Sequence, residues 1–427
     1  MRILHVIPSL DPAEGGPSFA VKAMAEALVN EGVEVTIATT AGAQNAPVIC
    51  DGLSVIGEES LPENASTERR GYRVVSFRRE FEPYKISFGL ARWLGHNVTK
   101  FDLIHIHALF SFSSTMAARI ARKKNVPYIV RPLGVLNRWG MENRRRIPKL
   151  VSFRLVELPI LLHAAVIHYT SETERMEAGE LNEKLARHSS VVIPLPIEQR
   201  AWSKEQRAKS GQQFLVRFPR VRGKRVVLFL SRIDPKKGIE LLLEAFAIVR
   251  EKEKDVALVI AGDGEKSYVR ELRERARRLF GSSAGGNARP TREEEEEEGA
   301  IIWTGHLSGE MKAAALAAAT IFVLPSYSEN FGIAAAEAFA VGLPCVLSEN
   351  VGLSDEAQLT GAALVTKCDI TELASAITTL MLDPEKRARM GKAARQFASE
   401  RLSLERIGRQ LQQEYHRSVK RSGFLDE

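Results

Sequence analysis

The sequence predicts an α/β protein with two domains, each built from a parallel sheet covered by helices. Short apolar runs that suit buried strands alternate with longer segments of helical periodicity along nearly the whole chain. This alternation of strand and helix patterns starts twice, near residues 2–8 and again near residues 225–231. A chain of 427 residues is also too long for one ordinary hydrophobic core. We place the boundary after Pro194-Leu195-Pro196, a stretch that reads as a linker, giving domains at 1–197 and 198–402.

Composition narrows the class of protein. Hydrophobic residues make up 44% and charged residues 26%, as in soluble globular proteins. No apolar run reaches the roughly 18 residues of a membrane span, and the N-terminus reads as a strand and loop rather than a signal peptide. Three widely spaced cysteines without metal-ligand spacing predict a reduced, cytoplasmic protein. The net charge of +7 alone does not separate nucleic-acid binders from membrane-surface proteins.

The first βαβ unit carries a glycine-rich turn. A strand at 2–8 leads through a loop containing Gly15 and Gly16 to a helix at 18–31 and a strand at 33–40. The Gly-x-Gly-x-x-Gly spacing is absent, so the fingerprint of nicotinamide or flavin binding is absent too. The two glycines allow the backbone to approach a ligand closely. An ordinary tight turn explains them equally well.

The next elements place a histidine at a strand end. Residues 47–80 alternate short strands with turns, which predicts a hairpin-like part of the first sheet, and a helix is expected at 86–98. The strand at 102–107 ends with His107. The carboxyl ends of parallel strands face the crevice where open α/β sheets bind ligands, so His107 is a candidate site residue. The alternative is a structural histidine with satisfied hydrogen bonds.

Residues 119–154 form a basic stretch with eleven Lys or Arg and one acidic residue. The charges are densest at Arg144, Arg145, Arg146 and Lys149, and an apolar segment of helical spacing follows. This order suits an anionic lipid surface, and it equally suits a solvated face followed by a core helix. Nucleic acid is disfavoured as a partner, because no aromatic residues that could stack on bases are interleaved with the charges.

The second set of βα units begins with two cations in a turn. Arg232 and Lys237 frame the loop between a strand at 225–231 and a helix at 239–251. A planar guanidinium and an ammonium together suit a diphosphate, although two cations in a loop are more often simply solvated. Later, six consecutive glutamates at 293–298 lie within residues 281–299, which we interpret as an acidic, disordered surface insert.

The most informative stretch is 325–344. An apolar strand at 320–324 precedes it, and a helix is expected from about 332 to 341, ended by Gly342. Glu337 lies within this apolar helix and Glu329 just before it. A buried carboxylate needs donors, which the hydroxyls of a ligand could supply, and the helix N-terminus near 330–333 suits a phosphate. A sugar nucleotide carries both groups. Alternatively, Glu337 pairs with an arginine and Glu329 is solvated.

This stretch resembles the Glu-x7-Glu signature of the family 4 glycosyltransferases. These enzymes have the GT-B fold and retain the anomeric configuration. The resemblance extends over nearly the whole chain, although Pro194-Leu195-Pro196 departs from the Pro-Asn-Gly often found there. The matching residues include Gly15-Gly16-Pro17, His107, 231–238, Gly262-Asp263-Gly264, Thr304-Gly305, Glu329, Phe331, Gly332, Glu337, Ala338, Gly342 and Pro344.

The resemblance implies two Rossmann-like domains facing across a cleft, with the last helix, 403–427, returning to the first domain. It implies metal-independent, cofactor-free transfer of sugar from a UDP- or GDP-sugar to a glycan or lipid-linked acceptor. Polysaccharide or glycolipid biosynthesis would then be its role, and the basic stretch at 119–154 suggests peripheral attachment to the cytoplasmic membrane face. The alternatives are another enzyme of this fold, such as a nucleotide-sugar epimerase or a phosphorylase, and a non-catalytic subunit that binds sugar nucleotides.

The resemblance also implies roles for single residues. Arg232 and Lys237 would hold the donor phosphates, Glu337 would bind the ribose, and His107 would touch the reacting sugar. Glu329 would contact the donor sugar and phosphate together with the backbone of the four residues that follow it. The remaining donor-binding positions implied are Gly15, Gly16, Gly262, Asp263, Asn330, Phe331, Gly332 and Ile333.

Overall fold

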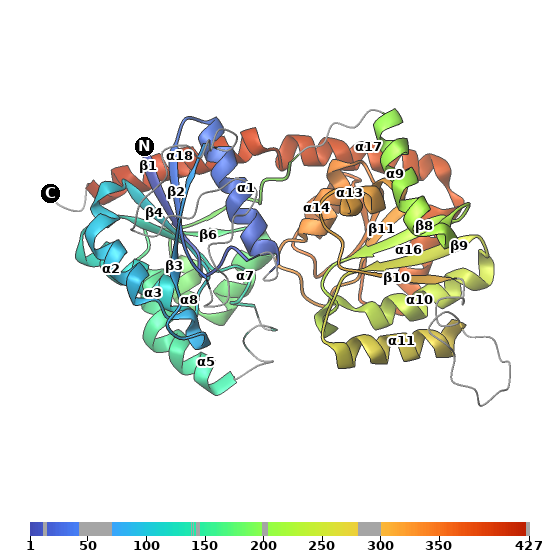
Figure 1. Ribbon diagram of the computed structural model, residues 1–427, viewed down its shortest axis with the longest axis horizontal. Coiled ribbons are helices and arrows are strands. Elements are labelled where there is room, and N and C mark those ends of the chain that lie inside the picture. Colours follow the sequence, from blue (N-terminus) through green and yellow to red (C-terminus); the bar gives the residue numbers. More distant parts are fainter. Residues whose placement is uncertain are drawn as a thin grey trace. The chain divides into compact units, whose positions relative to one another are not determined.

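The computed structural model describes residues 1–11, 15–41, 71–137, 139, 141, 146–198, 204–280 and 300–423. The chain forms two compact units (Figure 1). Unit 1 comprises Met1–Pro196 and Leu402–Glu427, and unit 2 comprises Ile197–Arg401. The acidic insert predicted at 281–299 lies outside the described residues. None of the described helices combines the length and the apolar character needed to cross a membrane.

Unit 1 is built on a parallel sheet of seven described strands in the order β3-β2-β1-β4-β5-β6-β7. Buried apolar residues fill the central strands, as expected for a parallel sheet covered on both faces. β3 pairs in parallel with β2; the rest of the segment in which a hairpin was predicted, residues 47–70, lies outside the described residues, so the hairpin stays a prediction. The strands are β1 (Arg2–Val6), β2 (Glu34–Ala41), β3 (Arg73–Arg78), β4 (Leu103–His107), β5 (Tyr128–Arg131), β6 (Val166–Tyr169) and β7 (Ser190–Val192).

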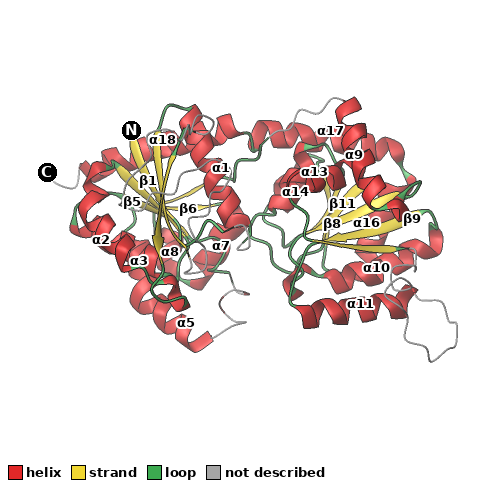
Figure 2. Ribbon diagram, in the orientation of Figure 1, coloured by secondary structure: helices red, strands yellow, loops and turns green. Residues whose placement is uncertain are grey.

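Helices cover both faces of this sheet (Figure 2). Several begin at side-chain caps: the hydroxyl of Ser111 accepts a hydrogen bond from the Ser114 N–H, and Ser171 caps α7 in the same way. The chain's last helix, α18, packs on α1, where the Gln412 amide donates to the carbonyl of Glu31. The helices are α1 (Gly16–Asn30), α2 (Phe88–Asn97), α3 (Phe112–Lys123), α5 (Arg146–Ser152), α6 (Leu158–Leu162), α7 (Glu172–Leu181), α8 (Glu183–Arg187) and α18 (Leu404–Gly423).

Unit 2 repeats the plan with a parallel sheet of six described strands, ordered β10-β9-β8-β11-β12-β13. These are β8 (Arg225–Leu230), β9 (Val256–Ala261), β10 (Ile301–Gly305), β11 (Ile321–Leu324), β12 (Cys345–Ser348) and β13 (Ala363–Thr366). The helices are α9 (Lys204–Arg217), α10 (Ile239–Lys252), α11 (Lys266–Phe280), α13 (Gly309–Ala318), α14 (Ile333–Ala340), α15 (Ser354–Leu359), α16 (Ile370–Leu382) and α17 (Pro384–Arg401).

The two sheets share one topological feature that positions a site. Chain order reverses between β1 and β4 in unit 1, and between β8 and β11 in unit 2. In open α/β sheets, ligands bind in the crevice outside the carboxyl ends of the strands at such a switch point. The loops that follow β8 and β11 therefore lie where a ligand of unit 2 is expected to bind. The predicted class of two α/β units with Rossmann-like sheets is confirmed.

Candidate active site

The switch point of unit 2 brings together two residues that are 92 positions apart in the chain. Lys237 ends a 3₁₀ turn, Pro235–Lys237, that follows β8, and Glu329 lies in the loop that follows β11. The Lys237 ammonium donates a hydrogen bond to Oε2 of Glu329 in a salt bridge. The Lys237 side chain is only 6% exposed and that of Glu329 18%. An ion pair largely removed from water in this way interacts more strongly than a surface pair.

Backbone contacts fix the two loops to each other. Gly238 has a φ of 64°, and a Cβ there would lie 2.2 Å from the carbonyl oxygen of Pro325, so only glycine allows this approach. The Tyr327 N–H donates to the carbonyl of Lys236 at 2.8 Å. Glu329 is also held on its other side, because its N–H donates to the carbonyl of Asn350 at 3.0 Å. The carboxylate is therefore presented by a rigid frame.

Cations outnumber carboxylates at this point. Burial raises the pKa of Glu329, but the charges of Lys237, Lys236 and Arg232 outweigh it and hold the pKa below its ordinary value. Burial, together with the charge of Lys237, lowers the pKa of Lys236. Arg232 is exposed and makes no hydrogen bond or salt bridge with the part of the chain that the structure describes. Three cations face two carboxylates here, Glu329 and Asp234, which leaves an excess of positive charge that suits an anionic ligand.

The helix that follows Glu329 adds backbone donors. α14 is preceded by Gly332, which has a φ of 95°, and no side chain caps its first turn. Phe331 is buried and anchors this corner in the core, while Asn330 and Ile333 flank the turn. The first N–H groups of a helix have no intrahelical acceptor and carry a partial positive charge. These groups extend the positive region at the carboxyl end of β11.

Glu337 differs from the expectation of an unpaired carboxylate. Its Oε1 accepts a hydrogen bond from the ammonium of Lys312, on α13, at 2.6 Å. Both side chains are partly buried, at 24% and 30% exposure. The protein partner is therefore a lysine rather than the arginine considered as an alternative. Oε2 of Glu337 has no donor within the described residues, and its contact with a ribose stays a prediction.

Gly262 and Asp263 line a neighbouring cavity of about 670 Å³ at the carboxyl ends of β9 and β10. A Cβ on Gly262 would lie 1.8 Å from the carbonyl oxygen of Ser231, so tight packing of the two loops explains this glycine without a ligand. Asp263 is exposed, and its carbonyl accepts from the Ile233 N–H at 2.8 Å. Basic residues of α11 form the other wall of the cavity, namely Lys266, Arg270, Arg273 and Arg277.

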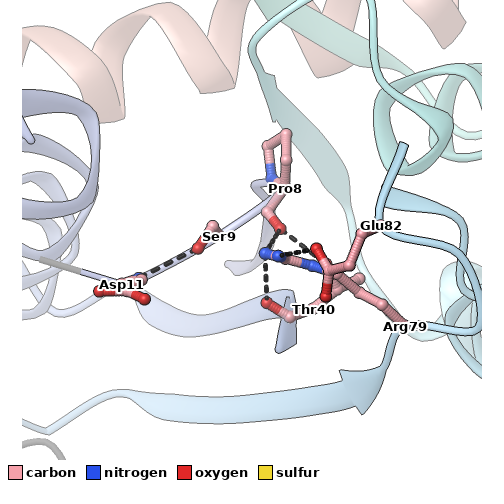
Figure 3. A network of polar contacts seen from close by, with 6 residues as sticks. All are labelled: Pro8, Ser9, Asp11, Thr40, Arg79 and Glu82. Carbon is pink, nitrogen blue, oxygen red and sulfur yellow. Dashed lines mark hydrogen bonds and ion pairs between the residues drawn. The ribbon is translucent and has the colours of Figure 1, made fainter. Parts of the chain in front are cut away.

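In unit 1, the turn with Gly15 and Gly16 starts α1 at the carboxyl end of β1. Gly15 has a φ of 84°, and Gly16 is the first residue of the helix. The guanidinium of Arg79 fixes the start of this loop by donating to the Pro8 carbonyl at 3.2 Å and to the Thr40 hydroxyl at 2.8 Å (Figure 3). The geometry leaves the contact of both glycines with a donor diphosphate as a prediction.

His107 lies in a fully buried network rather than at an open crevice. The Arg131 guanidinium has no acceptor capacity, so its N–H donates to Nδ1 of His107 at 3.4 Å. The protonated Nε2 of His107 then donates to Nδ1 of His5 at 2.8 Å. His5 is consequently protonated on Nε2, which has no acceptor among the described residues. The contact of His107 with a reacting sugar stays a prediction, and burial in this structure separates His107 from solvent.

A second chain of hydrogen bonds runs beside the first. The carbonyl of Ile193 can only accept, so it receives the Nε2–H of His168 at 2.8 Å. Nδ1 of His168 accepts from Nε2–H of His105 at 3.2 Å, and Nδ1 of His105 accepts from the Tyr415 hydroxyl at 2.7 Å. Burial, followed by the charge of Arg131, lowers the pKa of His5 and of His168 to about 3. All four rings are therefore neutral.

Three histidines of the same network are close enough to one another to be considered as ligands of a metal ion. His5, His105 and His107 each place a ring nitrogen within 4.8 Å of the others. The ring nitrogens of His5 and His107 bond to each other, however, and the buried Arg131 cation lies against His107. A divalent cation would have to displace these bonds beside a fixed positive charge. We therefore interpret the cluster as a neutral hydrogen-bond network.

Sequence reasoning missed several of these residues. Lys236 stands beside Lys237 and could have been read with it, because both lie in the same turn. Lys312 is one of many helical lysines, and nothing in its neighbours signals a partner on α14. His5 and His168 are single histidines in apolar strands. Only the strand order, which places β1 next to β4, brings His5 to His105.

The family follows from comparison with known proteins. Residues 213–397 match the family described as glycosyl transferases group 1, and residues 15–196 match the glycosyl transferase 4-like domain. The two matches together cover most of the chain, and the chain belongs to the group 1 glycosyltransferases. It is therefore a glycosyltransferase, as the resemblance implied.

Particular relatives lie within that family. A D-inositol 3-phosphate glycosyltransferase of Corynebacterium urealyticum is 26% identical over 435 residues, covering 97% of this chain and 95% of the relative. An alpha-monoglucosyldiacylglycerol synthase of Streptococcus pneumoniae is 33% identical over 152 residues, covering 36% of this chain and 29% of the relative.

Solved structures show the fold. The crystal structure of Anabaena HepE in complex with UDP and glucose has a TM-score of 0.70 at 18% identity, covering 97% of this chain and 99% of that one. Sucrose-phosphate synthase of Thermosynechococcus elongatus has a TM-score of 0.70 at 21% identity, covering 97% and 98%. With the two parallel-sheet units, these likenesses confirm the GT-B fold.

Proposed function

We propose that this protein transfers a sugar from a nucleotide diphosphate donor to a glycan or lipid-linked acceptor, with retention of anomeric configuration and without a metal. The observation that carries the proposal is the group of cations at the switch point of unit 2. Lys237 is fixed by Glu329, Arg232 is exposed beside it, and the uncapped first turn of α14 follows. A diphosphate is the ligand whose charge and size suit this arrangement.

The chemistry assigned to these residues is stabilisation of the leaving group. The bond between the anomeric carbon and the donor phosphate oxygen breaks, and negative charge grows on the departing diphosphate. Preorganised donors aimed at that charge lower the barrier, and Arg232, Lys237 and the N–H groups of α14 supply them. The acceptor hydroxyl forms its new bond on the same face of the sugar, and its proton goes to the departing phosphate oxygen.

The carboxylates take roles that position the donor. Glu329 orients the Lys237 ammonium, because their salt bridge directs one of the three N–H bonds and leaves the other two for phosphate. Glu337 has an acceptor oxygen beyond its bond to Lys312, which suits a ribose hydroxyl. Glu329 and the backbone of residues 330–333 then contact the donor sugar. Arg232 and Lys237 stabilise the negative charge of the leaving diphosphate, which a divalent metal does in other transferases.

A UDP-sugar is the proposed donor. The Anabaena structure that shares this fold is described as a complex with UDP and glucose, and this supports a uridine donor more than a guanosine one. The cavity beside Gly262 and Asp263 adjoins the carboxyl end of β9, next to the switch point, and offers room for the rest of the nucleotide.

The acceptor is proposed to be lipid-linked and reached from a membrane surface. Four apolar side chains are exposed along α5 and the π-helical turn Phe153–Glu157 that continues it; Ile147 is 75% and Leu155 72% exposed, with Leu150 and Val151 between them. Lys149 and Arg154 lie on the same segment, which is the pattern of a helix that lies on anionic lipid. Arg144 and Arg145 lie outside the described residues.

The experiment that tests the function is a donor panel. Purified protein is incubated with UDP- and GDP-sugars, and binding is followed by the shift in melting temperature, with the free nucleotides and free sugars as controls. We expect one nucleotide sugar to raise the melting temperature and to release its nucleotide when lipid-linked or glycan acceptors are added. Recovery of an epimerised sugar nucleotide, or binding without nucleotide release for every acceptor class, would contradict a transferase.

A further inference from the structure

A second basic cavity lies in unit 2, away from the proposed active site. It has a volume of about 710 Å³ and runs between α9 and α17, which lie near each other in Figure 1. Thr320 and Pro344 form part of its floor, and each directly precedes a strand. The cavity is therefore at the amino end of the sheet. Lys237 and Glu329 belong to the carboxyl end, so the two places are on opposite edges of one sheet.

The walls of this cavity carry positive charge only. Four cationic side chains line it, and no Asp or Glu does so among the residues that the structure describes. Burial, with the nearby charge of Arg395, lowers the pKa of Arg207, so these two guanidinium groups repel each other without a compensating anion. The cations are Arg207 on α9 and Arg387, Lys392 and Arg395 on α17.

Structural roles account for only part of this charge. Nη1 of Arg207 and Nη2 of Arg395 both donate to the Val341 carbonyl, each at 3.2 Å, at the end of α14. Arg387 donates to the carbonyl of Met381 at 2.9 Å, at the end of α16. Cations near helix C-termini are stabilising, so these contacts need no ligand. They occupy one nitrogen of each guanidinium, however, and a carbonyl dipole does not neutralise a full charge.

Lys392 has no such role. It lines the cavity one helical turn before Arg395, on the same face of α17, and its ammonium makes no hydrogen bond or salt bridge with any described residue. The helix caps therefore do not involve this ammonium; it is exposed to water, and it stands on the cavity wall beside Arg395, where it is available to a ligand. A ligand with more than one negative charge would contact it together with the free edges of the arginine forks.

We infer that this cavity is a second anion site, which binds a small molecule bearing two or more phosphate charges. Arginine forks match phosphate oxygens in pairs, and an ammonium adds a point charge. The cavity has the volume of a small-molecule site, so a pyrophosphate or a phosphorylated sugar fits it. The inference does not rest on the proposed function, because none of its residues belongs to the switch point.

Calorimetric titration with inorganic pyrophosphate tests the site. The background is Arg232→Ala, which is expected to weaken anion binding at the switch point and removes no side-chain hydrogen bond within the described residues. The cavity variant adds Lys392→Gln and Arg395→Gln. The matched control adds Arg389→Gln and Arg401→Gln, which remove the same charge from α17 outside the cavity. Ionic strength is held constant with sodium chloride.

We expect the background and the control to bind pyrophosphate equally, and the cavity variant to bind at least tenfold more weakly. Lys392→Gln alone should weaken binding at least threefold while the melting temperature stays unchanged, which separates loss of the site from loss of the fold. Equal weakening in the cavity and control variants would show a general charge effect and overturn the inference. Failure of the background protein to bind pyrophosphate would overturn it as well.

Discussion

Acidification from about pH 7 to about pH 5 is expected to destabilise unit 1 through its buried histidines. The pKa of His5 and of His168 is lowered from 6.5 to about 3, first by burial and then by the charge of Arg131. The unfolded chain therefore binds more protons than the folded one below pH 6.5. The stabilisation is fully present above that pH and is lost progressively as the pH falls toward about 3.

The size of the effect follows from the shift. At about pH 5 each unfolded imidazole is mostly protonated while the folded one is neutral, so each of these two residues lowers the free energy of unfolding by about 2 kcal/mol relative to neutral pH. His105 and His107, whose pKa values are also held well below the ordinary value by burial, act in the same direction. A loss of this size is a large part of the stability of an ordinary domain.

The assay is urea-dependent hydrogen exchange on peptides from β1 and β4, measured at both pH values. His5→Gln keeps a carbonyl oxygen that can accept from His107 and removes one titrating ring, so the difference between the two pH values should shrink by about 2 kcal/mol. His96→Gln, at an exposed position, should leave that difference unchanged. Equal unfolding free energies at both pH values in the wild type would refute the neutral network.

Three further predictions concern the proposed site and surface. Arg232→Ala should raise the activation free energy of transfer by about 2–4 kcal/mol and leave the melting temperature unchanged. Lys237→Ala should lower both the transfer rate and the melting temperature, because it leaves the partly buried carboxylate of Glu329 without its ion-pair partner. Steady-state kinetics and melting curves distinguish the two variants. Glu337→Gln should weaken donor binding by about 1.5–3 kcal/mol in calorimetry, and a 2′-deoxyribose donor should lose less in this variant than in the wild type. Ile147→Ser with Leu155→Ser should reduce flotation with anionic vesicles while donor affinity stays the same, and undiminished flotation would count against the lipid surface.

The sequence predicted the elements of the fold well, because they depend on local pattern. The helix expected at about 332–341 is α14, Ile333–Ala340, and the strand expected at 102–107 is β4, Leu103–His107. Apolar runs of strand length and glycine stops carry this information. The parallel pairing of β3 with β2 was not predicted, since a strand's partner, parallel or antiparallel, is set by distant residues rather than by its own sequence.

The site was predictable where its residues lie at strand ends and not where they depend on packing. Lys237 and Glu329 each follow a strand, and the sheet order then brings them together. The partner of Glu337 could not be read, because a lysine on α13 reaches it only through tertiary packing. His107 was read as an open site residue from its place at the end of β4, but Arg131 and three further histidines enclose it.

Calorimetry with UDP and uridine determines whether the cations beside Glu329 bind the diphosphate of a nucleotide sugar. Wild-type protein and Arg232→Ala are each titrated with both ligands. If the cations bind the diphosphate, UDP affinity falls by about 1.5–3 kcal/mol in the variant while uridine, which lacks the phosphates, binds both proteins equally. Equal UDP affinity in the two proteins would contradict diphosphate binding by these cations, and so would an equal loss for both ligands.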